Sequence, residues 1–237
     1  PIPIQPTAHY SMGGIPVNKN GEVLSDGASK PVIGLYAAGE CACVSVHGAN
    51  RLGCNSLLDA SLHGRITGKT ISRFIREGAE MSSLPKEPAA IAEEEIKRTL
   101  GSTGKEKVAD IRNDLQIDMS RDCGLFRQEA ALKKLWENIK GLQERSQHIS
   151  VDDKGEIFNT DLIEAIELSH LLDFSEVIVV GAIARQESRG SHFRDDYPKR
   201  DDKNWLKHTL AFKTPRGPKL EFKPVAITKY QPEERKY

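Results

Sequence analysis

The sequence lacks the features that mark nucleic-acid binders and membrane-spanning proteins. Its charge is balanced, with 34 Lys and Arg against 34 Asp and Glu, so bulk charge argues against binding to nucleic acid or to an anionic membrane surface. The longest apolar run, Val177–Ala184, is far shorter than the roughly 18 residues that a spanning helix needs. No signal peptide is visible, and we expect any membrane association to go through a partner.

Cysteine is also scarce. The spacing of the four cysteines fits neither a secreted disulfide framework nor a paired C-x-x-C metal site. We therefore expect all four to be reduced, assign no redox role to Cys54 and predict no metal site. The chain also begins at Pro1 without an initiator Met, in a segment that reads as the middle of a fold, and we expect it to be a piece of a longer protein.

The stretch His47–Leu57, with the sequence HGANRLGCNSL, is the most informative part of the chain. It places an imidazole, a guanidinium, two carboxamides and two glycines just ahead of a helical pattern. Asn55 and Ser56 are residue types that cap helix N-termini, and such a terminus attracts anions. The stretch therefore predicts a binding site for an anion or a polar ring.

Two segments upstream add candidate residues. His9 is a site candidate in a short extended segment that ends in a glycine pair, although this segment by itself favours a surface or core imidazole satisfied by its neighbours. Leu35–Gly39 has the apolar run of a buried strand, and Glu40 follows it. A carboxylate at such a strand end can accept hydrogen bonds from ribose hydroxyls, although a solvated Glu explains it equally well. Turn residues between positions 14 and 33 predict a hairpin or meander.

Helical patterns dominate the middle of the chain. Residues 56–76 form one predicted helix, and the Gly64–Thr70 segment inside it lacks both the spacing and the setting of a phosphate-binding loop. A linker is expected at 79–88 and a helical bundle at 89–185, with predicted helices at 93–100, 105–119 and around 132–142. Asn159 should cap a further helix, and Asp173–Ser175 should separate that helix from a last apolar one.

The carboxyl-terminal segment, 186–237, contains two patterns. Arginine and aspartate alternate between Arg185 and Asp202, which favours an ordered polar segment over a solvated loop because Arg forms bidentate pairs with carboxylates. The extended runs 205–212 and 220–227 flank a Pro- and Gly-containing turn and predict a terminal β-hairpin.

Taken in order, these blocks resemble the flavoprotein subunit of succinate dehydrogenase and fumarate reductase. The matching blocks are HYSMGG, GLYAAGE, HGANRLG, NSLL and ESRGSH, at His9–Gly14, Gly34–Glu40, His47–Gly53, Asn55–Leu58 and Glu187–His192. Phe158–Leu162 and Lys207–Phe212 extend the resemblance over essentially the whole chain. The family's Gly-rich dinucleotide fingerprint, its flavin-linking histidine and most of its capping domain have no counterpart here.

The resemblance implies an α/β fold, the end of a Rossmann-like FAD-binding domain at 1–78, followed by the helical bundle and the hairpin segment. It also implies FAD as the cofactor, with Glu40 on the ribose and with Asn55, Ser56 and Leu57 at the flavin. His9 and Arg51 match the ligands of the substrate carboxylates, while His47 is either a site residue or a residue that organises the backbone. No catalytic residue is expected, because the family's proton-transferring arginine lies outside this chain.

The implied activity is interconversion of succinate and fumarate by hydride transfer to or from FAD, with electrons passed to an iron–sulfur subunit and quinone. Such a subunit lies on the cytoplasmic or mitochondrial matrix face of a respiratory membrane, held there by membrane anchor subunits. The missing amino-terminal part of the flavoprotein is a further implied partner. An L-aspartate oxidase, which shares the HGANRL block, and a non-catalytic docking fragment are the alternatives.

Overall fold

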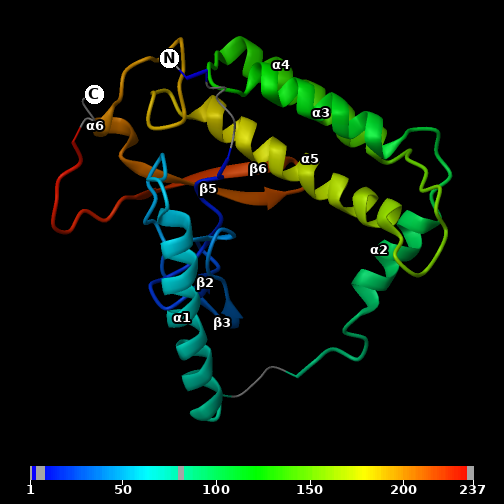
Figure 1. Cartoon of the computed structure of the whole chain (residues 1–237), viewed down its shortest axis with the longest axis horizontal. Coiled ribbons are helices and arrows are strands. Elements are labelled where there is room, and N and C mark those ends of the chain that lie inside the picture. The colour runs from blue at the N-terminus through cyan, green and yellow to red at the C-terminus, as the bar shows by residue number, and fades with distance from the viewer. Residues whose placement is uncertain (1, 4–8, 80–82, 234–237) are drawn as a thin grey trace.

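The computed structural model describes residues 2–3, 9–79 and 83–233, and these fall into three parts (Figure 1). Short strands and helix α1 form the first part, helices α2 to α5 the second, and a loop with helix α6 and a hairpin the third. The strands are β1 (Ile15–Pro16), β2 (Glu22–Leu24), β3 (Pro31–Tyr36), β4 (Ala42–Cys43), β5 (Lys207–Thr214) and β6 (Gly217–Pro224). The helices are α1 (Asn55–Arg76), α2 (Ala90–Leu100), α3 (Val108–Asp122), α4 (Glu129–Ser146), α5 (Thr160–Ala184) and α6 (Asp202–Trp205).

Two small sheets build the first part. Strands β2 and β3 pair antiparallel as the predicted hairpin, and β1 pairs in parallel with β4. The turn between β2 and β3 is held by Asp26, whose Oδ1 accepts hydrogen bonds from three backbone amides at residues 28 to 30. Val17, Val23 and Ala42 form a small core beneath these strands.

The expectation of a buried strand at Leu35–Gly39 is wrong. Strand β3 ends at Tyr36, and the side chains of Ile33 and Leu35 are 81% and 51% exposed. An apolar run identifies a segment that can be buried, but neighbouring strands or helices must cover it. In this chain β3 pairs only with β2 among the described strands, which leaves those side chains uncovered.

Helix α1 packs against this first part through close backbone approach. Gly21 has a φ of 81°, and any side chain there would collide with the buried Thr67 on α1. The glycine therefore permits the hairpin to lie directly on the helix. Gly64–Thr70 lies in the middle of α1, which agrees with the rejection of a phosphate-binding loop.

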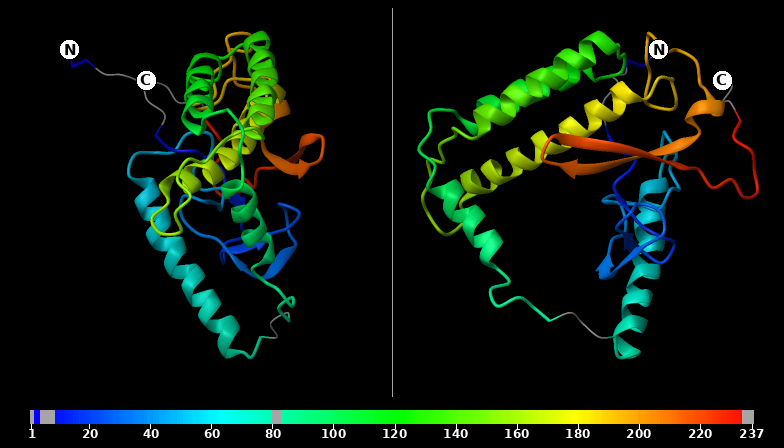
Figure 2. Two further views of the ribbon diagram at one scale, coloured as in Figure 1. Left: turned by 90° about the vertical axis from the view of Figure 1, so that its right-hand side faces the viewer. Right: turned by 180° about the vertical axis from the view of Figure 1, so that it is seen from behind.

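Helices α3, α4 and α5 enclose the main core, and α2 also packs against α5 (Figures 1 and 2). The largest fully buried apolar side chains of this core come from α3, α4, α5 and the loop between α4 and α5: Ile111, Leu132, Leu135, Ile139, Val151, Leu168, Leu172 and Val179. Trp136 packs at the edge of this core, and its Nε1 donates to Glu176 at 2.9 Å. The predicted helices are thus present, with ends that differ by a few residues.

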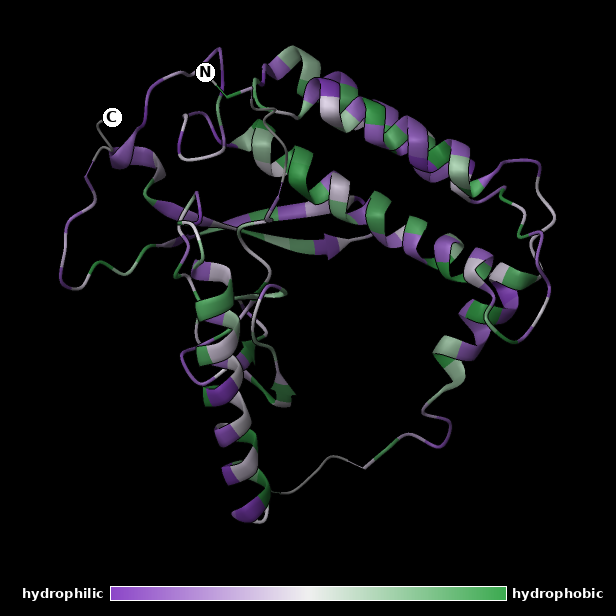
Figure 3. Ribbon diagram, in the orientation of Figure 1, coloured by the Kyte–Doolittle hydropathy of each residue, from purple (hydrophilic) through white to green (hydrophobic). Residues whose placement is uncertain are grey.

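The predicted break at Asp173–Ser175 is wrong, because α5 runs without interruption from Thr160 to Ala184 (Figure 3). None of the three residues is a Gly or Pro, so nothing in the backbone ends the helix there. Asp173 lies on the outer face and accepts a hydrogen bond from Lys213 at 2.6 Å, while Ser175 is buried. The helix begins at Asn159 as predicted, where Oδ1 accepts from the Leu162 amide at 2.8 Å.

The terminal hairpin is also present and connects the first and second parts. Strands β5 and β6 pair antiparallel over their full lengths and contact α5. From the same hairpin, Leu210 packs on Gly27, and the Lys223 ammonium donates to the Gly27 carbonyl at 3.0 Å. Among residues 2–3, 9–79 and 83–233, no helix combines the length and apolar character needed to cross a bilayer.

Replacement of Leu135 by Ala should lower the free energy of unfolding by about 2–5 kcal/mol, because it leaves a cavity in a fully buried site. Denaturant unfolding followed by circular dichroism measures this change. Ile91→Ala on α2 is the matched control, since that side chain is 85% exposed and its truncation should cost less than about 0.5 kcal/mol. Equal losses for the two variants would contradict the assigned core.

Candidate functional site

Helix α1 begins differently from the way the sequence indicated. Cys54, with a φ of 64°, is the residue before the first turn, and no side chain caps the helix. Asn55 and Ser56 therefore lie inside the first turn and are not its caps, which corrects the prediction. The first turn contains no acidic residue either, so the amide groups at this end of a 22-residue helix present positive charge to a ligand.

Arg51 lies four residues before the first residue of this helix, and little of its hydrogen-bonding capacity is used within the described residues. Its guanidinium carbon is 4.8 Å from the centroid of the Tyr10 ring, and Nη1 donates to the Leu52 carbonyl at 3.1 Å. The Nε atom is buried and has no partner among the described atoms. A guanidinium with free donors is suited to grip a carboxylate through two parallel hydrogen bonds.

Tyr10, which contacts Arg51, also lies near two other predicted residues, His9 and Glu40. His9 precedes it in the chain and is exposed. Burial raises the pKa of Tyr10 most, the negative charges of Asp59 and Glu40 raise it further, and Arg51 opposes them. Glu40 and Arg51 thus act on the same ring, although Glu40 itself is exposed. Gly39, with a φ of 78°, permits the left-handed turn before Glu40 and lies beside Ala60 on α1.

A cluster of His47, Asp59 and His63 lies behind these residues and was missed by the sequence reading. Asp59 is only 6% exposed, and its two carboxylate oxygens accept from different imidazoles. Oδ2 pairs with His47 Nε2 at 3.0 Å, and Oδ1 pairs with His63 Nδ1. The spacing of Asp59 and His63, four residues apart on a helix, is the one signal that could have indicated half of this cluster.

The carboxyl-terminal loop docks on the same stretch. The Ala49 carbonyl accepts hydrogen bonds from both the backbone amide and the hydroxyl of Ser191, each at 3.2 Å. Gly190 has a φ of 60°, and a Cβ there would lie 2.4 Å from the Ala49 oxygen. Only glycine fits this approach, so the block at residues 187 to 192 is a structural support of the predicted site.

The arginines and aspartates of that loop are ordered, as predicted. Glu187 is fully buried and accepts from Arg185 at 2.7 Å, from Arg189 at 2.7 and 2.9 Å, and from the Asp201 amide at 2.8 Å. Arg194 is also fully buried and donates to the Ala182 carbonyl near the end of α5. These bonds satisfy the buried charges and anchor the loop to the bundle.

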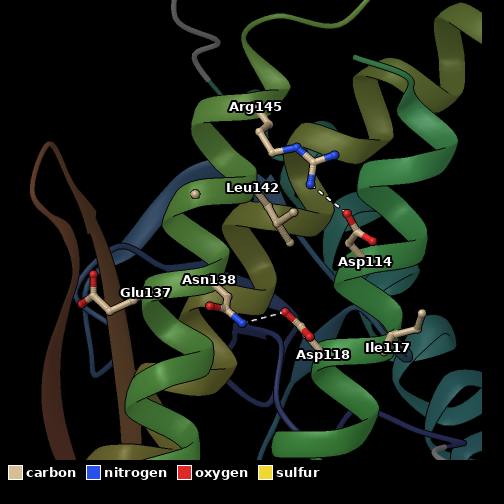
Figure 4. Close-up of a pocket in the computed structure, with 8 residues that line it drawn as sticks. Asp114, Ile117, Asp118, Glu137, Asn138, Leu142 and Arg145 are labelled. Carbon is tan, nitrogen blue, oxygen red and sulfur yellow. Dashed lines mark hydrogen bonds and ion pairs between the residues drawn. The ribbon is translucent and has the colours of Figure 1, made fainter.

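A polar groove lies between α3 and α4, and none of the predicted site residues lines it (Figure 4). Arg145 donates to Asp114 at 2.7 Å and to Glu106, and Asn138 donates to Asp118 at 2.8 Å. Because these groups already satisfy one another, the groove offers few free donors to a ligand.

Comparison with known proteins gives matches to both halves of the chain. Residues 112–237 match the family model described as the fumarate reductase flavoprotein C-terminal domain, and residues 1–57 match an FAD-binding domain. The fumarate reductase flavoprotein subunit of Haemophilus influenzae is 40% identical over 100% of this chain. The succinate dehydrogenase flavoprotein subunit of Coxiella burnetii is 43% identical over 95% of it.

Solved structures are similar over nearly the whole chain. A mutant of Escherichia coli quinol fumarate reductase aligns with 99% of it, at a TM-score of 0.88 and 39% identity. The Mycobacterium smegmatis Sdh1 complex in the apo form aligns with 94%, at a TM-score of 0.79 and 28% identity. The chain spans only 39% of the length of the H. influenzae relative and 40% of the E. coli chain. These findings confirm the predicted fold class, the resemblance to this flavoprotein family and its cofactor FAD.

Stability should depend on His192 between pH 6.5 and about 4. Its Nδ1 accepts from Arg127 Nη1 at 2.9 Å, and its Nε2 donates to the Arg185 carbonyl. Burial is the main cause that lowers the pKa of this imidazole from 6.5 to about 4, and nearby arginines lower it further. The unfolded chain therefore binds a proton in this window that the folded chain does not, and stability falls as the pH falls.

Unfolding free energies of the chain and of its His192→Gln variant, measured from pH 7 to pH 4, test this. As the pH falls, the free energy of unfolding should decrease more steeply for the unchanged chain than for the variant, by at most about 1.4 kcal/mol per pH unit. The lowered pKa of His208 contributes equally to both proteins. Parallel curves for the two proteins would show that His192 is not held neutral.

Proposed function

Because this chain belongs to the fumarate reductase flavoprotein family, we propose that it forms the carboxyl-terminal part of a flavoprotein that interconverts succinate and fumarate. The observation that carries this proposal is the setting of Arg51. Its guanidinium lies on Tyr10, next to the uncapped N-terminus of α1, with a buried Nε that has no partner among the described atoms. Such a group is matched by a carboxylate ligand.

Arg51 and His9 would bind the two carboxylates of the substrate. The guanidinium offers two parallel N–H groups to one carboxylate, and the exposed imidazole of His9 adds a further donor close to Tyr10. Holding both ends of a four-carbon diacid fixes the orientation of its central C–C bond, and orientation is a major source of rate enhancement. Arg51 acts here as a ligand and charge stabiliser, and we assign it no proton transfer.

The residues around the start of α1 fit FAD. Glu40 is exposed and free to accept from ribose hydroxyls, and Asn55, Ser56 and Leu57 form the open first turn. The positive end of the helix favours a negatively charged edge of the cofactor by about 0.3–1 kcal/mol. Bound FAD supplies the hydride acceptor and donor, and the protein groups bind and orient. The remaining contacts would come from the part of the family's length that this chain does not span.

The partners follow from the same proposal. We infer that the complete flavoprotein passes electrons to an iron–sulfur subunit and quinone, and that it lies at the cytoplasmic or matrix face of a respiratory membrane through anchor subunits. The names of the relatives support this assignment, since they include a quinol fumarate reductase and an Sdh1 complex. We propose domain boundaries at residues 78 and 185, with 79–88 as the linker.

Arg51→Lys in the full-length flavoprotein should lower kcat/KM for the dicarboxylate by about 10- to 100-fold, because Lys cannot form the bidentate pair. FAD content, read from flavin absorbance, should stay the same. Arg65→Lys is the matched control on exposed helix surface and should be silent. Unchanged turnover in Arg51→Lys would remove Arg51 from the site and favour a docking fragment without substrate contacts.

The 237-residue chain by itself should not hold FAD tightly. Its sequence contains no Gly-rich dinucleotide fingerprint, and the proposed contacts cover only the ribose and one edge of the flavin. Absorbance at flavin wavelengths after purification measures the bound fraction. Stoichiometric FAD on this chain alone would contradict the proposal that the rest of the site lies elsewhere.

A further inference from the structure

The buried carboxylate of Asp59 lies one turn into α1, behind the proposed substrate ligand. Both of its oxygens are engaged, by His47 on the preceding loop and by His63 on the next turn of the helix. The three side chains are largely buried, with 4% of Asp59, 10% of His47 and 17% of His63 exposed. A carboxylate only accepts, so each imidazole presents an N–H to it.

A series of contacts leads from this carboxylate to Arg51. The rings of His47 and Tyr10 meet edge to face, with centroids 5.3 Å apart and planes at 82°. Tyr10 also contacts the Arg51 guanidinium, whose carbon lies 4.8 Å from the same ring centroid. Asp59 therefore lies two side chains away from the group that is proposed to bind the substrate.

Each member of this series has few other polar restraints. His47 Nδ1 is buried without a partner among the described atoms, so the bond to Asp59 is the one side-chain hydrogen bond that orients the His47 ring there. Arg51 makes one side-chain hydrogen bond in the described structure, to the Leu52 carbonyl, and its Nε is unpartnered. The direction in which its free donors point thus depends on the Tyr10 ring.

We propose that Asp59 is a positioning residue for dicarboxylate binding and acts through His47 and Tyr10 on Arg51. This inference rests on the proposed role of Arg51. It assigns no contact with substrate to Asp59, His47 or Tyr10. A carboxamide at this position has one acceptor oxygen for two imidazoles, so the His47 ring is no longer held in place. Tyr10 then loses its edge contact, and the guanidinium no longer meets the substrate with both N–H groups aligned.

His63 provides a matched control within the cluster. It pairs with the other oxygen of the same carboxylate, but it has no ring contact with Tyr10 among the described residues. His63→Gln should therefore cost stability in the same way as a change at Asp59, because it also breaks a buried hydrogen bond to the carboxylate. It should leave the path to Arg51 intact.

Steady-state kinetics of the full-length flavoprotein, with succinate and an artificial electron acceptor, test the proposal. Asp59→Asn should raise KM about tenfold or more, change kcat by less than about threefold and retain FAD, while His63→Gln changes KM by less than about twofold. Similar KM values for Asp59→Asn and wild type, equal KM effects of the two variants, or loss of FAD in Asp59→Asn would overturn it.

Variants of Tyr10 test the contact between Tyr10 and Arg51, and this test remains available if Asp59→Asn fails to fold. Tyr10→Leu should raise KM as Asp59→Asn does, Tyr10→Phe should not, and the double variant Asp59→Asn/Tyr10→Leu should be no worse than either single one. Additive effects, or a silent Tyr10→Leu, would overturn the inference. If Arg51→Lys is also silent, the proposed function has failed; if Arg51→Lys alone is impaired, only the role of Asp59 has failed.

Discussion

The hydrogen bonds from Ser191 to the Ala49 carbonyl join a late segment of this chain to an early one at the site. They bring a loop that follows the helical bundle onto the stretch that precedes α1. The loop can serve as a support because it is itself rigid: fully buried Glu187 and Arg194 are satisfied by arginines, aspartates and the last carbonyls of α5. The conformation of residues 47 to 57 thus depends on the whole carboxyl-terminal segment.

The candidate site itself contains polar groups that remain available to a ligand. An uncapped helix terminus, a guanidinium with a buried free nitrogen and an exposed carboxylate at Glu40 are each costly or neutral without a ligand. In the groove between α3 and α4, by contrast, polar groups of similar type are paired, as Arg145 is with Glu106 and Asp114. The contrast between the satisfied groove and the unsatisfied loop is the reason to place ligand binding at the loop.

The sequence indicated most of these features through residue type and order. Helical periodicity identified the bundle, and five motif blocks in order indicated the family, whose resemblance implied the cofactor and the ligand residues to propose. It misjudged the start of α1, because Asn55 and Ser56 have capping side chains but Cys54 takes the left-handed conformation instead. It also divided α5 at Asp173–Ser175, where two polar residues suggested a break that no Gly or Pro enforces.

Local pattern by itself determined the helices and the terminal hairpin, since these depend on spacing along the chain, and the resemblance to a known family implied which residues bind a diacid and FAD. Tertiary structure alone decided which of these residues meet. Tyr10 contacts Arg51 across 41 residues of sequence, and Asp59 is shared by His47 and His63. Apart from the four-residue spacing of Asp59 and His63 on the helix, no periodicity indicates these contacts. Their burial and pairing arise only when the loop, the helix and the carboxyl-terminal segment pack together.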